Sequence, residues 1–132
     1  MTAIDTNILV RIFVGDDELQ AARAIKLIAA QDGIFVSKTV VLEFAWVLSA
    51  VYSVPRDGLI DALKTLAGLD KFEIEDRSNV EHAIELFAQG YDDFADALHL
   101  CSSRRATAFV TFDRRLITKA RKLAGTIAVR QP

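Results

Sequence analysis

Short apolar runs that stop at polar or acidic residues recur along the chain and predict β-strands. The first run opens the chain and ends at Asp5, where Thr6 and Asn7 favour a turn or a helix cap. Later runs of this kind cover residues 34–36, 71–76, 108–112 and 127–129. The run at 71–76 alternates apolar with charged residues, so we expect it to be an edge strand with one solvated face.

Between these runs, apolar residues recur at helical spacing and predict amphipathic helices. A short apolar segment after Asn7 ends at Gly15, and the next helix, capped by Asp16 or Asp17, is expected to pack on a sheet. Further helical patterns cover residues 40–51, 55–68, 78–90, 91–100 and 114–122. Strands therefore alternate with helices, which predicts an α/β fold around a central, mainly parallel sheet. Residues 1–132 are expected to form a single domain.

The segment 40–51 is unusual because only Glu43 and Ser49 interrupt its apolar residues. A helix that is apolar nearly all round is expected to be buried on several sides, by its own core or by a second copy of the chain in a homodimer. An unpaired buried carboxylate costs several kcal/mol, so Glu43 should face a cleft, meet a cation or stay protonated. The alternative is a structural ion pair with Lys38 or an arginine.

Three other acidic positions also stand where chemistry is expected. Asp5 and Asp113 each follow an apolar strand and precede a helix, and the carboxyl ends of strands are where ligands bind in open α/β sheets. Asp93 and Asp96 lie three residues apart, so they share one face near the start of a helix. Helix capping would explain Asp5 or Asp93, but it explains Asp96 less well because Asp96 lies among apolar residues.

These positions form a group of acids that the predicted topology can bring to one edge of the sheet: Asp5, Glu43, Asp96 and Asp113. Two carboxylates about 5 Å apart repel by about 3 kcal/mol at an effective dielectric constant near 20, so a cation is needed to hold four of them ionised. Oxygen ligands without a cysteine cluster favour Mg²⁺ or Mn²⁺ over zinc. Such a centre suits hydrolysis of a phosphodiester.

Charge is distributed unevenly along the chain. Residues 97–132 hold eight Lys or Arg residues against one acidic residue, whereas residues 1–96 hold eight against seventeen. A basic end of this kind can hold a polyanion backbone, although a solvated basic helix is the alternative. The residues expected to contact phosphates are Arg104, Arg105, Arg114, Arg115, Lys119 and Lys122.

The remaining composition points to a protein of the reducing cytoplasm. The single cysteine, Cys101, excludes a disulfide within the chain and is expected to be a small buried thiol. No leader pattern precedes the first predicted strand, and no apolar run is long enough to span a membrane. We therefore expect a soluble, cytoplasmic protein.

The motifs around the four acids resemble those of PIN domains of the VapC toxin type, over nearly the whole chain. They read Ile4-Asp5-Thr6-Asn7, Leu42-Glu43-Phe44 followed by Trp46-Val47-Leu48, Asp93-Phe94-Ala95-Asp96-Ala97-Leu98, and Val110-Thr111-Phe112-Asp113. Each single motif is weak evidence. The resemblance rests on four acids in the family's order, each in the expected strand or helix context.

The resemblance implies an α/β/α sandwich and a Mg²⁺- or Mn²⁺-dependent endoribonuclease, the toxin half of a type II toxin–antitoxin pair. It implies that Asp5, Glu43, Asp96 and Asp113 bind the metal, with Thr6 as a polar neighbour that helps to place metal or water. Asp93 is an additional acid that could bind the metal, support the other ligands or cap its helix. The implied partners are RNA, a cognate antitoxin and a second copy of the chain.

Two other functions fit parts of the same pattern. A haloacid-dehalogenase-like phosphatase also begins with a strand and an aspartate, but its motif requires a second acid where this chain has Asn7. A non-catalytic RNA-binding or partner-regulated module would use the acids only as caps and ion pairs. Such a module should show no site for a divalent metal.

Overall fold

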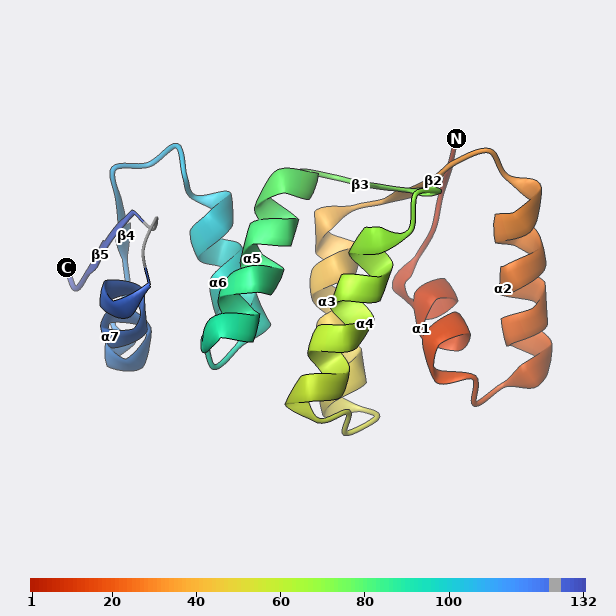
Figure 1. Cartoon of the computed structure of the whole chain (residues 1–132), viewed down its shortest axis with the longest axis horizontal. Coiled ribbons are helices and arrows are strands. Elements are labelled where there is room, and N and C mark those ends of the chain that lie inside the picture. The colour runs from red at the N-terminus through yellow and green to blue at the C-terminus, as the bar shows by residue number, and fades with distance from the viewer. Residues whose placement is uncertain (124–126) are drawn as a thin grey trace. The chain divides into compact units, whose positions relative to one another are not determined.

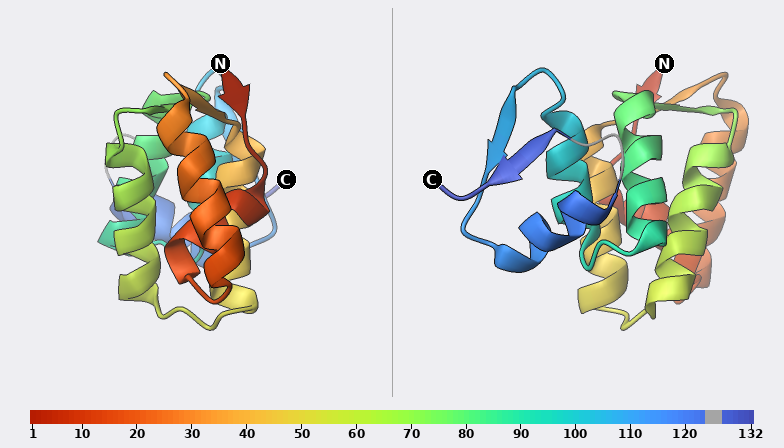
Figure 2. Two further views of the ribbon diagram at one scale, coloured as in Figure 1. Left: turned by 90° about the vertical axis from the view of Figure 1, so that its right-hand side faces the viewer. Right: turned by 60° about the vertical axis from the view of Figure 1, so that its left-hand side comes forward.

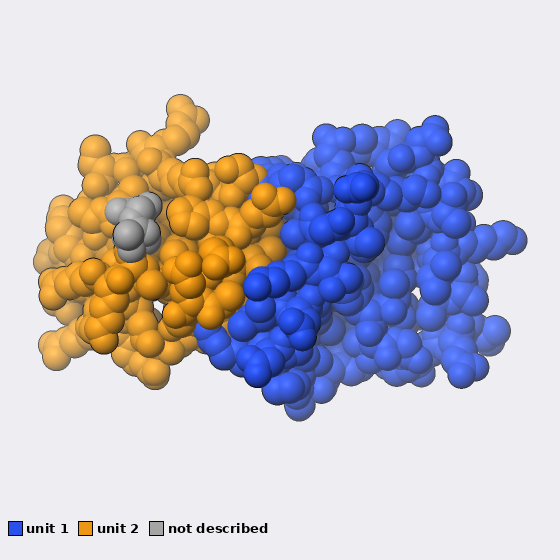
Figure 3. Space-filling view, viewed as in Figure 1, with its two compact units in different colours: residues 1–77 blue, residues 78–132 orange. Residues whose placement is uncertain are grey.

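The computed structural model of the protein describes residues 1–123 and 127–132. The chain divides into two compact units, residues 1–77 and residues 78–132 (Figure 3). The first unit holds Asp5, Thr6 and Glu43. The second holds Asp93, Asp96 and Asp113 and all six residues that are expected to contact phosphates. A single domain of residues 1–132 stays a prediction.

Three short strands form a parallel sheet in the first unit. They are β1 (Thr2–Ala3), β2 (Ile34–Val36) and β3 (Phe72–Ile74), with β2 in the middle (Figure 1). In β3 the buried Phe72 and Ile74 alternate with the exposed Glu73, as the sequence predicts for an edge strand. The run before Asp5 therefore becomes a strand of this sheet, and Asp5 follows its carboxyl end.

Four helices accompany this sheet: α1 (Thr6–Val14), α2 (Glu18–Ala30), α3 (Lys38–Ala50) and α4 (Arg56–Gly68). α1 packs against both α2 and α3, and α3 packs against α4 (Figures 1 and 2). Gly15 ends α1 with φ of 70°, a left-handed conformation that a side chain would strain. Asp17 caps α2 by accepting from the Gln20 amide at 3.0 Å.

α2 packs less deeply than its apolar pattern predicts. Ala24 is its one buried residue among those described, whereas the side chains of Leu19 and Ile25 are 80% and 54% exposed. α2 lies against α1, so a narrow stripe around Ala24 suffices for its contact. α2 was expected to pack on a sheet, whereas its main contact among the described residues is with α1.

Within one chain, α3 is fully buried along one stripe only, and its burial on further sides by a second copy of the chain stays a prediction. The stripe consists of Val41, Phe44, Ala45 and Leu48. Glu43 lies outside this stripe and is exposed, and Trp46 is 63% exposed. The expectation that the chain's own core buries Glu43 is therefore wrong. One helical stripe provides the fully buried contacts of α3, with Val40, Leu42 and Val47 partly buried beside it.

The second unit contains α5 (Arg77–Gln89), α6 (Phe94–Ser102), β4 (Ala108–Val110), α7 (Arg114–Lys122) and β5 (Ala128–Arg130), with the first residue of α5 at the boundary. β4 and β5 form a parallel pair, and α7 packs on β5. The rings of Phe87 and Phe94 meet edge to face at 6.0 Å and join α5 to α6.

The alternation of strands and helices and the parallel pairing confirm the predicted α/β class. The pairs fall into two sheets in the described residues, because β4 pairs with β5 while β1, β2 and β3 pair among themselves. The final strand lies at Ala128–Arg130, one residue beyond the predicted run.

Candidate functional site

α6 begins with two of the predicted acids. Asp93 caps the helix by accepting from the Ala95 amide at 2.8 Å, and Asp96 lies in the first turn. Asp93 is exposed, whereas Asp96 is partly buried. The capping alternative therefore accounts for Asp93 and leaves Asp96 without a capping role.

Asp113 stands between β4 and the start of α7. Its carboxylate accepts from the backbone amides of Arg115 at 3.0 Å and Leu116 at 3.1 Å. The Asp113 amide in turn donates to the Thr111 hydroxyl at 3.0 Å. These bonds fix the acid at the junction of strand and helix, the position that the sequence predicts.

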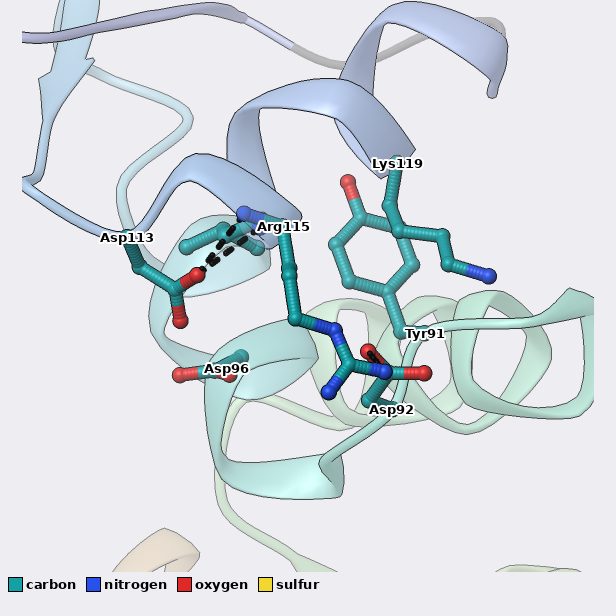
Figure 4. Close-up of a pocket in the computed structure, with 7 residues that line it drawn as sticks. Tyr91, Asp92, Asp96, Asp113, Arg115 and Lys119 are labelled. Atoms are coloured by element: carbon teal, nitrogen blue, oxygen red, sulfur yellow. Dashed lines mark hydrogen bonds and ion pairs between the residues drawn. The ribbon is translucent and has the colours of Figure 1, made fainter.

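Asp96 and Asp113 line one pocket of about 120 Å³ within the second unit (Figure 4). The other lining residues are Tyr91, Asp92, Arg115, Leu116 and Lys119. Three carboxylates and two cationic side chains therefore surround a small open space. The sequence prediction that Asp96 and Asp113 lie close together is supported by their shared pocket, and the prediction that Arg115 and Lys119 share a helix face agrees with it.

The environment of Asp96 disfavours its charge. Its pKa is raised above the ordinary value of 3.8 by burial first, and then by repulsion from Asp93, Asp113 and, more weakly, Asp92, with His99 opposing. A cation bound beside Asp96 and Asp113 would offset that repulsion. The oxygen-only donors match Mg²⁺ or Mn²⁺, so the residues fit such a metal on chemical grounds.

A salt bridge crosses the pocket. The Arg115 guanidinium contacts the Asp92 carboxylate at 2.8 Å, and the Arg115 side chain is 80% exposed. In Figure 4 this side chain extends from α7 toward Asp92, and Lys119 projects from the same helix. Two of the predicted phosphate-binding residues thus stand next to the acids.

Tyr91 is a pocket residue that the sequence argument missed. It is 1% exposed, and its hydroxyl has no hydrogen-bond partner within residues 1–123 and 127–132. Burial raises its pKa, so the hydroxyl keeps its proton and remains a donor. The available signal was an aromatic residue between Gly90 and the acidic pair, which also suits an ordinary core residue.

Asp5 and Thr6 belong to the first unit. Asp5 is exposed and caps α1 by accepting from the Thr6 amide at 2.7 Å. Thr6 is 4% exposed, and its hydroxyl has no hydrogen-bond partner among the described residues. A buried, unsatisfied hydroxyl next to an acid suits the role of placing water or a metal.

Glu43 is an exposed side chain on α3, and its predicted alternative pairing with Lys38 does not occur. The Lys38 ammonium contacts Asp76 at 2.9 Å, and the Lys38 amide donates to Glu75 at 2.9 Å. Because Glu43 is exposed, a metal-binding role for it is supported by the resemblance alone.

The remaining basic residues are spread over the surface of the second unit. Arg105, Arg114 and Lys122 are exposed, whereas Arg104 lies 2.6 Å from Nδ1 of His82. Cys101 is buried and free, as predicted, and burial raises its pKa to about 11, which keeps the thiol protonated. It is not a candidate nucleophile.

Across the described residues, no three His, Cys, Asp or Glu side chains are grouped closely enough to hold a metal ion. Asp96 and Asp113 lie in the second unit, and Asp5 and Glu43 in the first. A metal site made of all four acids therefore stays a prediction.

The family model of the PIN domain matches residues 2–122, which is most of the chain. The chain belongs to the PIN domain family. Its acids Asp5, Glu43, Asp96 and Asp113 all lie within the matched range. No curated protein matches the sequence.

Membership of the PIN domain family indicates the general type of reaction. PIN domains are generally metal-dependent nucleases that act on RNA, and they typically use divalent metals. This assignment sets aside the haloacid-dehalogenase-like alternative. Within the described part of the chain, no helix has both the length and the apolar character needed to cross a bilayer.

Proposed function

We propose that this PIN domain is a Mg²⁺- or Mn²⁺-dependent endoribonuclease that acts on cytoplasmic RNA as the toxin of a type II toxin–antitoxin pair. The observation that carries the proposal is the pocket of the second unit, where Asp96 and Asp113 adjoin two cationic side chains. Family membership supports the nuclease activity. The toxin role rests on the resemblance of the motifs to VapC toxins.

The four acids have distinct surroundings but one proposed role. Asp5, Glu43, Asp96 and Asp113 would hold the metal, with Thr6 orienting water and Asp93 supporting Asp96. When bound, the metal would polarise the phosphoryl oxygens and make water more acidic. Arg115 and Lys119 would hold the phosphate backbone.

The exposed apolar residues of the first unit support the proposed protein partners. Trp46 on α3 is 63% exposed and Val51 after α3 is 61% exposed, so α3 retains apolar surface for a second copy or an antitoxin segment. We expect light scattering to show a homodimer and Trp46→Ser to weaken it. A parent protein that stays monomeric at micromolar concentration would exclude the homodimer.

RNA cleavage tests the proposed activity directly. Asp96→Asn removes a ligand charge and should lower the Mn²⁺-dependent cleavage rate at least a hundredfold, because a single essential electrostatic group is worth about this much. Asp61→Asn changes an exposed acid of α4 and should leave the rate unchanged. RNA binding without cleavage by the parent, in any divalent metal, would favour the non-catalytic RNA-binding module.

A further inference from the structure

Phe112 is a large aromatic side chain that the fold leaves in solvent. It is 81% exposed, whereas Phe87 and Phe94 of the same unit are 3% and 2% exposed. Exposed aromatic residues gain free energy when a flat, apolar surface covers them. Phe112 therefore contributes little to the core, and its ring is available to contact a ligand.

The backbone on both sides of Phe112 is held in place. The Thr111 amide donates to the Arg130 carbonyl at 3.0 Å, and the Asp113 amide donates to the Thr111 hydroxyl at 3.0 Å. The Asp113 carboxylate is bonded in turn to two amides at the start of α7. Phe112 thus stands on a segment that is ordered before any ligand binds, which lowers the entropic cost of binding.

The neighbours of Phe112 point to a nucleic acid. Asp113, whose Cα lies about 3.8 Å from that of Phe112, lines the acidic pocket. Arg114 and Arg115 follow directly, and both are exposed. An aromatic ring followed along the chain by a pocket-lining acid and two exposed arginines combines a stacking surface for a base with charges for phosphates. Val110, two residues before Phe112, is also 48% exposed, so a protein interface is the other occupant of this surface that the experiment has to separate from RNA.

We propose that Phe112 stacks on an RNA base next to the phosphodiester held at the Asp96–Asp113 pocket, and so helps to select the cleaved position. This inference rests on the proposed ribonuclease function. Stacking is tolerant of base identity but stronger for purines with their larger ring surface, so a preference for purines at that position is expected.

Binding measurements without metal isolate the stacking contact from cleavage. The ligands are a fluorescent oligo(A) dodecamer and a base-free ribose-phosphate dodecamer of the same charge, both in EDTA. Phe112→Ala should weaken oligo(A) binding about 5- to 100-fold and leave the base-free ligand unaffected. Phe112→Trp should restore oligo(A) binding, and Phe112→Leu should not, because leucine supplies apolar volume without a π face.

Two control variants separate a loss of stacking from a loss of charge and from the loss of any exposed apolar side chain. Arg115→Ala should weaken both ligands alike and flatten the salt dependence, whereas Phe112→Ala should leave the salt slope unchanged. Leu19→Ala removes an equally exposed apolar side chain from α2 and should not change either affinity. Since Phe112 is exposed, melting curves should show Phe112→Ala folded like the parent.

The failures of the two proposals are distinguishable. If the parent cleaves RNA and binds oligo(A) but Phe112→Ala or Phe112→Leu binds as tightly as the parent, the stacking inference alone is wrong. If Phe112→Ala instead changes the particle size in light scattering with unchanged RNA affinity, Phe112 belongs to a protein interface. If the parent cleaves RNA with Mn²⁺ but binds neither ligand, the stacking inference alone is wrong, and if it also fails to cleave RNA, both proposals fail.

Discussion

At the scale of single residues, Asp96 is the most informative side chain. Burial and neighbouring carboxylates raise its pKa, so the folded protein holds the Asp96 proton more tightly than the unfolded chain does. The contribution of Asp96 to the free energy of unfolding is therefore most favourable below its ordinary pKa of 3.8 and is lost as pH rises through the raised value. At neutral pH without metal, its ionised form destabilises the fold.

Asp96→Asn should consequently be as stable as the parent near pH 4 and more stable near pH 7. The gain arises because the substitution removes a charge that burial and the neighbouring carboxylates disfavour, and it is reduced by the solvent that reaches this partly exposed group. Melting temperatures in EDTA across this pH range measure it, with Asp61→Asn as the control. A variant that loses stability at pH 7 would instead place Asp96 in a structural hydrogen-bond or ion-pair network.

At the scale of elements, the predictions from the sequence were most accurate where one or two residues determine a helix end without help from tertiary contacts. Gly15 and Asp17 identify a helix end and a helix start because backbone conformation and capping require those residue types. The strand–acid–helix pattern at Asp5 and Asp113 was correct for the same reason: each acid caps the helix that follows its strand.

The predictions from the sequence that were wrong concern how much of an apolar helix the rest of the chain buries. The composition of α3 gives no sign that one stripe buries enough of it, so the exposure of Glu43 and Trp46 could not be predicted. Tyr91 was missed because a buried tyrosine with an unpaired hydroxyl differs from a core tyrosine only in its surroundings. Such outcomes depend on tertiary contacts that local periodicity does not encode.

α7 offers a test of the basic surface as an element. Arg115→Glu with Lys119→Glu should reduce the slope of log Kd for single-stranded RNA against log salt by about 0.7 for each lost phosphate contact. Base preference should change little. Arg23→Glu with Lys26→Glu makes the same charge change on exposed positions of α2 and serves as the control. Equal slopes for the α7 variant and the parent would show that Arg115 and Lys119 face solvent and do not contact RNA phosphates.

At the scale of the whole molecule, metal binding links the proposed site to folding. A metal that binds only the folded chain raises the melting temperature by mass action, by about 2.7 kcal/mol in stability at a hundredfold excess over Kd. The parent begins with repelling carboxylates around Asp96, and a divalent cation turns that repulsion into attraction. Stability and activity should therefore depend on the same ion.

The melting temperature of the parent and of Asp96→Asn, each with EDTA and with Mn²⁺, is the most direct test of a metal centre at these acids. We predict that Mn²⁺ stabilises the parent by several degrees and stabilises Asp96→Asn far less, while without metal the variant is at least as stable as the parent. A parent whose melting temperature does not respond to Mn²⁺, beside a destabilised Asp96→Asn, would contradict the nuclease account.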